Sequence, residues 1–194
     1  MKRILMSLAI LSSILPIAAG CRQAGDCNFM ELAKNRYSVR SFDSKKVDRA
    51  VVDRILEAGR LAPTAVNSQP QKIYVVESVE KMELLNQISP CMYGAPHCFV
   101  VCYDKQLAVP RGERDYGEID ATIVLTHMTM QAAAEGIGTC IVGYFDPEKL
   151  KAALELPQNL CPVLLLPFGY PSEGSKPSDK HFASRDIKDM VSYL

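Results

Sequence analysis

Apolar residues recur along the chain with two different periods, and these periods predict helices and strands. A recurrence every three or four residues makes one helix face apolar, and it predicts helices at residues 29–35, 49–61, 79–88, 118–135 and 147–154. Short apolar runs rich in β-branched residues are typical of buried strands. They predict strands at residues 72–77, 98–103, 139–144 and 163–168.

The residues that flank these segments support their boundaries. Asp48 precedes the second helix and can accept a hydrogen bond from its first turn, and Pro63 follows that helix. Gly136 and Gly138 follow the longest helix, where they can end it. Because strands alternate with helices and no linker divides them, we expect one α+β (or α/β) domain over residues 29–194. Its mixed central sheet would be flanked by helices.

The first 21 residues have the three-part pattern of an export signal. Two basic residues precede an apolar stretch at residues 4–17, and three small residues then precede Cys21. Ala-Ala-Gly-Cys resembles a bacterial lipobox, in which Cys21 would carry the lipid and residues 22–28 would form a polar tether. We therefore expect an exported protein, lipid-anchored to a bacterial membrane. Two alternatives are an ordinary cleaved signal and a true start at Met30, which would leave the protein in the cytoplasm.

Composition excludes several classes of function. Lys plus Arg equals Asp plus Glu at 22 each, which gives no electrostatic reason to expect nucleic acid as a partner. The seven cysteines are an odd number without a Cys-x-x-Cys pair, and the three histidines are scattered, so no zinc site is expected. Neither a nucleophile elbow nor a P-loop is present. An enzyme with this sequence would take its reactive centre from a cofactor.

The segment at residues 36–40 alternates basic and polar side chains. Arg36, Ser38 and Arg40 point the same way if the backbone is extended, and they could converge on one anionic group. The planar guanidinium fork of arginine suits phosphate. The alternative is a solvated basic stretch on a surface loop.

The loop after the second helix carries two amides. Asn67 and Gln69 alternate between Pro63 and Pro70, and their side chains offer both the donors and the acceptors that a flavin edge requires. A plain surface turn uses the same residue types, so this alternative stays open.

Two later segments complete the set of candidates. Gly143 ends an apolar run at residues 139–144, where it would let a bound ring approach the backbone. Residues 169–171 read Gly-Tyr-Pro, and a basic segment at residues 176–181 follows. Ordinary turn residues and a solvated tail are the respective alternatives.

These four segments, in this order, resemble the nitroreductase family of FMN flavoproteins, and the resemblance covers residue 29 to the C-terminus. It implies a nitroreductase-like α+β fold and an intertwined homodimer with two FMN molecules at the subunit interface. It also implies an FMN-dependent NAD(P)H oxidoreductase that reduces a nitroaromatic, a quinone or a related small acceptor by a ping-pong mechanism. Reductive dehalogenation, or a lipid-anchored flavin-binding protein without turnover, are the alternatives.

The resemblance also assigns roles to residues. Arg36, Ser38 and Arg40 would hold the FMN phosphate and ring edge, and Asn67 and Gln69 would meet the ribityl chain or the flavin edge. Val142 and Gly143 would present backbone amides near the reactive side of the flavin, and Lys180 would complete the phosphate site. No side chain is named as catalytic, because the chemistry takes place at N5 of FMN. Tyr93, Tyr103, Tyr116 and Tyr144 are all candidates for the aromatic residue that contacts the ring, and the sequence does not rank them.

Overall fold

The computed structural model describes residues 28–111 and 114–194. The expected leader at residues 1–21, with Cys21, and residues 22–27 of the expected tether lie outside the described residues. No helix in the described part of the chain is both long and apolar enough to cross a membrane.

The helices lie where the apolar period predicts them, within two residues at each end. They are α1 (Phe29–Asn35), α2 (Arg49–Arg60), α3 (Val79–Ile88), α4 (Tyr116–Ala134) and α5 (Pro147–Ala153). Ser78, Asp115 and Asp146 each cap the helix that follows by accepting a hydrogen bond from its first turn. Asp48 stands at the start of α2 as predicted, but its side chain makes no capping bond.

Four strands form the central sheet in the order β1-β2-β6-β5. These are β1 (Gln71–Val76), β2 (His97–Asp104), β5 (Gly138–Thr139) and β6 (Leu160–Gly169). All three pairings are antiparallel, and within residues 28–111 and 114–194 the parallel component of the expected mixed sheet is a single bridge between Ser38 and Thr139. A separate short hairpin joins β3 (Pro110–Arg111) to β4 (Arg114–Asp115).

The strand predicted at residues 139–144 is wrong in its length. Only Gly138 and Thr139 pair as a strand, and Val142 adds an isolated bridge to Leu165. Cys140 N–H still donates to Pro167 O at 3.2 Å, in the register of the ladder. Pro167 has no N–H to donate in return, so the ladder is interrupted at this pair.

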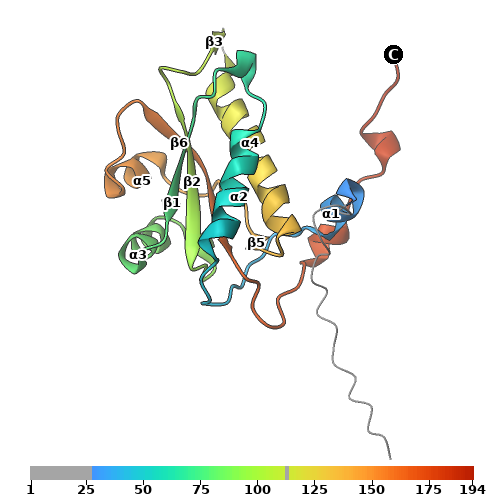
Figure 1. The fold of residues 1–194 in the computed structure, drawn as a ribbon. Helices are drawn as coiled ribbons and strands as arrows, with labels where there is room; N and C mark the ends of the chain where they lie inside the picture. The colour runs from blue at the N-terminus through green and yellow to red at the C-terminus, as the bar shows by residue number, and fades with distance from the viewer. Residues whose placement is uncertain (1–27, 112–113) are drawn as a thin grey trace, which may run out of the picture.

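Helices cover both faces of the sheet (Figure 1). Successive side chains of β2 point to opposite faces of the sheet. Phe99 and Val101 pack against α2 and α4 on one face, whereas Cys98, Val100 and Cys102 pack against α3 and α5 on the other. Two helices, α2 and α4, approach each other closely on the first face. A Cβ atom on Gly59 of α2 would lie 2.8 Å from Met128 Cγ of α4, so glycine permits the close approach of these helices.

The register of the strands defines two ends of the sheet. Gln71 lies opposite Tyr103 at one end, which we call the loop end. Five residues further along β1, Val76 lies opposite Cys98, and Thr139 pairs with Phe168 one step beyond, at what we call the basic end. At about 3.4 Å per residue, the two ends are about 17 Å apart.

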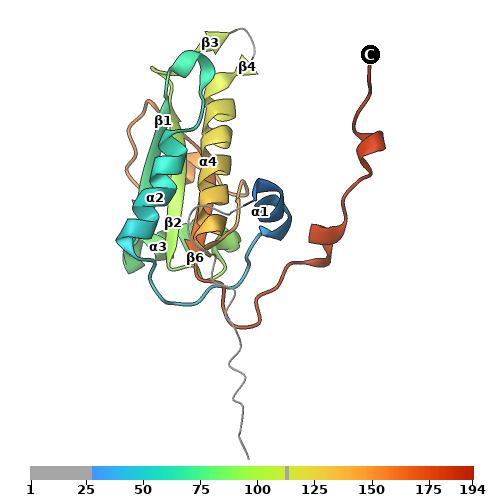
Figure 2. The same ribbon diagram turned by 45° about the vertical axis from the view of Figure 1, so that its right-hand side comes forward.

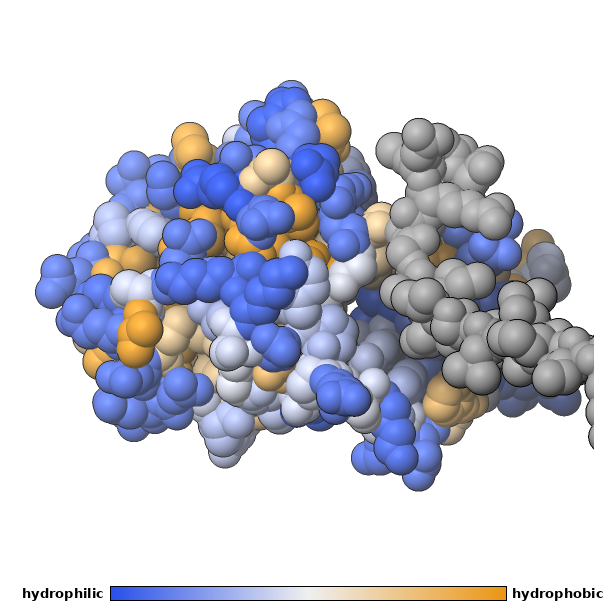
Figure 3. All heavy atoms as spheres, turned by 60° about the horizontal axis from the view of Figure 1, so that its bottom comes forward, coloured by the Kyte–Doolittle hydropathy of each residue, from blue (hydrophilic) through white to orange (hydrophobic). Residues whose placement is uncertain are grey.

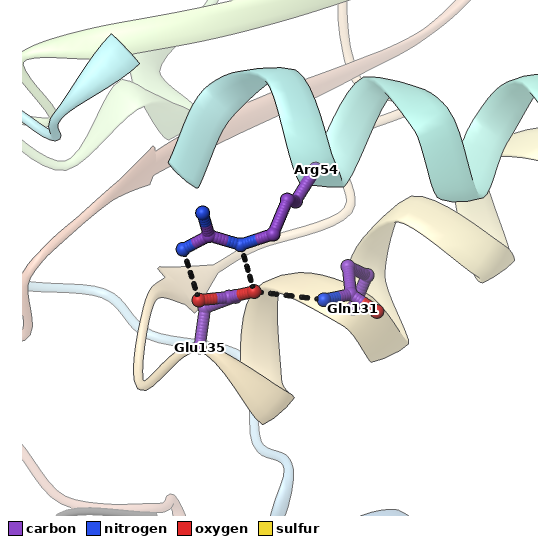
Figure 4. Close-up of polar contacts among 3 residues, drawn as sticks. All are labelled: Arg54, Gln131 and Glu135. Carbon is purple, nitrogen blue, oxygen red and sulfur yellow. Dashed lines mark hydrogen bonds and ion pairs between the residues drawn. The ribbon is translucent and has the colours of Figure 1, made fainter. Parts of the chain in front are cut away.

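An ion pair fixes the helices at the basic end. Arg54 of α2 donates to both carboxylate oxygens of Glu135, at 2.6 and 2.8 Å, and Gln131 donates to the same carboxylate at 2.9 Å (Figure 4). Because Glu135 directly follows α4, these bonds tie α2 to the turn that leads into β5.

Beyond β6 the chain leaves the layers. Residues 172–194 run outward as an extended tail with two short 3-10 turns, Asp179–Phe182 and Ile187–Asp189 (Figure 2). Large apolar side chains of this tail are exposed, among them Phe182, Ile187 and Met190. A tail with exposed apolar residues is typical of a segment that packs on another surface.

Candidate active site

The basic segment is held against the sheet by its backbone. Val39 N–H donates to Thr139 O at 2.9 Å, and the bridge from Ser38 to Thr139 extends this contact. Val39 is 1% exposed, and a Cβ atom on Gly138 would lie 2.7 Å from its Cγ2. Since Val39 points into the core and successive side chains of an extended segment alternate, Ser38 and Arg40 point away from it.

Arg36, Ser38 and Arg40 gather around one thiol. Burial raises the pKa of Cys140, and the positive charges of Arg40 and Arg36 and the nearby Ser38 hydroxyl act in the opposite direction. Arg40 also donates to the backbone oxygen of Ser38 at 3.2 Å. The structure therefore brings the three candidate side chains together, beside the segment that leads from β5 to Gly143.

Tyr93 belongs to the same cluster. The neighbouring Cys91 thiol and burial both raise the pKa of its hydroxyl, and Arg40 opposes them. The hydroxyl of Tyr93 therefore lies near Arg40 of the basic segment.

The other three tyrosines lie elsewhere along the sheet. Tyr144 directly follows Gly143, and its backbone oxygen accepts a hydrogen bond from Ser89 at 2.7 Å. The bridge from Val142 to Leu165 places this part of the segment near the middle of the sheet. Tyr103 donates to Asp115 at 2.6 Å at the loop end, and Tyr116 follows that aspartate at the start of α4. Tyr93 is therefore the candidate aromatic residue near the basic segment, and Tyr144 is the candidate next to Gly143.

The structure corrects the expected role of Val142. Its N–H donates to Leu165 O and its carbonyl oxygen accepts from Leu165 N–H, both at 2.9 Å, so its amide cannot serve a ligand. Gly143 is exposed, and its N–H makes no hydrogen bond within the described residues. Gly143 is thus the backbone donor that this turn offers.

The C-terminal tail places the basic segment at residues 176–181 beside the basic segment at residues 36–40. Tyr37 donates to the backbone oxygen of Ser175 at 3.4 Å, and His181 contacts the backbone oxygen of Lys34 at 3.1 Å. Lys180, which precedes His181, is exposed. The segment that carries Lys180 therefore lies beside the segment that begins at Arg36.

Asn67 and Gln69 are not part of this cluster. They lie in the loop that precedes Gln71, at the loop end, and Gln69 Nε2 donates to Asn67 Oδ1 at 3.0 Å. The sheet and its helices separate them from Ser38, which pairs with Thr139 at the basic end. Within one chain, the candidate residues form two groups.

Figure 3 views the molecule from below, relative to Figure 1, and shows apolar patches among mostly hydrophilic side chains. Ile141 and Tyr144 are among the exposed apolar residues. Exposed Ile141 directly follows Cys140, whose thiol is influenced by the positive charges of Arg36 and Arg40. An apolar residue near positive charge fits a ligand that has an aromatic part and an anionic part.

Comparison with known proteins identifies this arrangement. A family model described as the nitroreductase family matches residues 33–90 and 86–170. The chain belongs to the nitroreductase family.

Individual relatives agree with this assignment. A crystal structure of a nitroreductase family protein from Clostridium difficile 630 is 35% identical and superposes with a TM-score of 0.80, covering 86% of this chain and 98% of that one. A putative NADH dehydrogenase/NAD(P)H nitroreductase from Methanothermobacter thermautotrophicus is 28% identical over 153 residues, covering 74% of this chain and 78% of that protein. An FMN reductase (NADPH) from Bacillus subtilis is 27% identical over 172 residues, covering 77% and 69%.

In this nitroreductase, sequence reasoning did not find Asp120. Its side chain is 2% exposed and accepts a hydrogen bond from Ala65 N–H at 2.9 Å, in the loop that carries Asn67. A signal was available, because Asp120 precedes Val124 and Met128 by four and eight residues on the apolar face of α4. A carboxylate on an apolar helix face requires a partner in the fold.

Proposed function

We propose that this nitroreductase is an FMN-dependent oxidoreductase that takes electrons from NAD(P)H and passes them to a nitroaromatic, a quinone or a related small acceptor. The observation that carries the proposal is the convergence of Arg36, Ser38 and Arg40 near Cys140, on a segment that offers the N–H of Gly143 three residues further along. Two relatives from Bacillus subtilis are named FMN reductase, which supports the choice of cofactor. When bound, FMN would supply the centre that accepts and releases electrons.

The residues present fit FMN. Arg36 and Ser38, with Lys180 from the neighbouring tail segment, provide two positive charges and a hydroxyl for a phosphate group. Arg40 lies next along the same segment, where its charge would stabilise negative charge on the ring. Gly143 would donate its N–H to the ring edge without a side chain in the way.

A complete site would combine two copies of the chain. Asn67 and Gln69 lie at the loop end, so they reach a flavin held at the basic end only if that flavin is bound by a second copy. An apolar groove lined by Phe29, Leu61 and Met130 runs between α1, α2 and α4, and the tail exposes apolar side chains. Both features support an intertwined dimer that buries these surfaces.

The absorbance spectrum of the purified protein, followed by anaerobic titration with NADH and NADPH, tests this proposal. We expect a yellow protein whose flavin absorbance is lost on addition of one or both reductants. Colour that persists with both would favour a flavin-binding protein without NAD(P)H turnover. A colourless protein that cannot be reconstituted with FMN would contradict the cofactor assignment as well.

The export signal leads to a separate proposal, that Cys21 carries a lipid anchor. Its support is the sequence pattern before Cys21. Membrane fractionation of the native protein and of Cys21→Ser would test it. We expect the native protein in the membrane fraction and the variant outside it, and a variant that stays in the membrane fraction would contradict the anchor.

A further inference from the structure

The loop between α2 and β1 is held in a strained backbone conformation. Val66, Asn67 and Gln69 all have positive φ angles, of 46°, 57° and 48°. Asparagine tolerates this left-handed region, but it is unfavourable for most other residues with a side chain, and most of all for a β-branched residue such as valine. Strain of this kind persists only where the surrounding structure imposes it.

Two side-chain oxygens accept hydrogen bonds from the backbone of this loop and impose its conformation. Thr64 Oγ1 accepts from Gln69 N–H at 3.0 Å, which closes the loop on itself. Asp120 Oδ1 accepts from Ala65 N–H at 2.9 Å. Because Asp120 lies on α4, this second bond ties the loop to the core of the protein.

Unpaired polar atoms are concentrated at the same place. Within the described residues, four buried side-chain atoms have no hydrogen-bond partner, and three of them are Asp120 Oδ2, Ser68 Oγ and Gln71 Oε1. A buried carboxylate oxygen without a partner destabilises the fold, and an apolar residue at this position of α4 would avoid that cost. The carboxylate is therefore not explained by the stability of the core.

We propose that Asp120 is a positioning residue that holds the loop so that Asn67 and Gln69 face a bound flavin; this inference rests on the function proposed above. The bond from Gln69 Nε2 to Asn67 Oδ1 uses one donor and one acceptor. It leaves the Asn67 amide nitrogen as a donor and the Gln69 oxygen as an acceptor, both on exposed residues. Asp120 acts through the loop and does not touch the ligand itself.

Three variants on α4 test the role of the carboxylate. Asp120→Ala removes the acceptor, Asp120→Asn keeps an oxygen in its place, and Glu118→Gln is a matched control that removes a charge from an exposed position of the same helix. FMN affinity would be measured by the quenching of FMN fluorescence. We expect Asp120→Ala to weaken binding by roughly tenfold or more, with Asp120→Asn restoring most of the loss and the control unchanged.

Hydrogen exchange in the FMN-free protein gives a second measurement that does not depend on the cofactor. In Asp120→Ala we expect faster exchange at residues 64–69, while the amides of β2 stay protected. A general loss of stability would raise exchange throughout the sheet, which separates it from release of the loop. Unchanged exchange at residues 64–69 would overturn the proposed hold on the loop.

Ala65→Pro removes the same hydrogen bond from the other side, and it decides the question if Asp120→Ala fails to fold. Thr64 is extended, with φ −131° and ψ 162°, and Ala65 opens a short 3-10 turn, so proline is tolerated there. We expect a similar loss of FMN affinity, and no further loss when both changes are combined. Wild-type affinity in both single variants would overturn the role of Asp120, whereas a wild-type protein that binds no FMN would overturn the proposed function.

Discussion

The two ends of the sheet hold their candidate residues in different ways. At the basic end, Ser38 and Val39 pair with Thr139 through backbone contacts, and the alternation of an extended chain then directs the side chains. At the loop end, left-handed residues are held by a carboxylate that lies 55 positions away in the sequence. The alternation of side chains along an extended segment can be predicted from the local sequence, whereas a left-handed conformation held by a distant side chain cannot.

One substitution made at both ends should have opposite effects. Val39 is 1% exposed, and Val39→Gly would remove buried apolar area, which we expect to lower the free energy of unfolding by about 2–4 kcal/mol. Val66 is 75% exposed with φ at 46°, so Val66→Gly should raise this free energy by up to about 1 kcal/mol, because glycine relieves the strain. Urea unfolding of both variants measures the contrast. A destabilised Val66→Gly would show that the loop conformation is not strained.

Arg36→Ala tests whether the basic end binds the cofactor or only supports the fold. We expect FMN affinity to fall by roughly 10- to 100-fold, since a charge-assisted hydrogen bond is lost. The melting temperature of the FMN-free protein should stay unchanged. Arg49→Ala, at an exposed position of α2, is the matched control for loss of a charge. Unchanged FMN affinity in Arg36→Ala would remove Arg36 from the site.

The basic end should also respond to acid through His97. This residue is 2% exposed, its Nε2 accepts from Val47 N–H at 3.1 Å, and its Nδ1 has no hydrogen-bond partner in the described part of the chain. Burial lowers its pKa below the usual 6.5; Glu77 acts against this shift and Lys46 adds to it. Below pH 6.5 His97 is therefore protonated in the unfolded chain but stays neutral in the folded chain. The free energy of unfolding consequently falls as the pH falls.

Urea unfolding at a series of pH values measures this effect. We expect His97→Asn, which keeps an acceptor for Val47, to lose less stability between pH 7.5 and 5.5 than the wild-type protein does. His127→Asn is the control for a histidine that does not accept this bond. Equal pH dependence in the wild-type protein and His97→Asn would contradict the assignment.

The smallest effect is expected at the ion pair between Arg54 and Glu135. The side chain of Arg54 is 52% exposed, so solvent screens the pair, and Arg54→Ala should cost about 1 kcal/mol or less. Its hydrogen bond lowers the pKa of Glu135, so this contribution is present at neutral pH and is lost as acid protonates the carboxylate. A loss that exceeded the effect of Val39→Gly would show that this pair, and not the packed core, organises the basic end.

Sequence patterns predicted local structure better than they predicted the site. The bounds of α3 match the prediction because its apolar period and its Ser78 cap are both local. The strand at residues 139–144 was overestimated, since the interruption depends on Pro167, which pairs with this segment only in the fold. The motifs likewise named Asn67 and Arg36 without indicating that they lie at opposite ends of the sheet.

The thiols that line one face of the sheet have a consequence for chemical stability. Burial raises the pKa of Cys98 and of Cys102 to about 12, so at neutral pH almost none of either thiol is present as the reactive thiolate. Disulfide exchange and attack by peroxides both require the thiolate. We expect Cys91 and Cys161, which are only half-buried, to be oxidised first. Once the protein is folded, we expect the thiols of Cys98 and Cys102 to stay reduced even in an oxidising compartment.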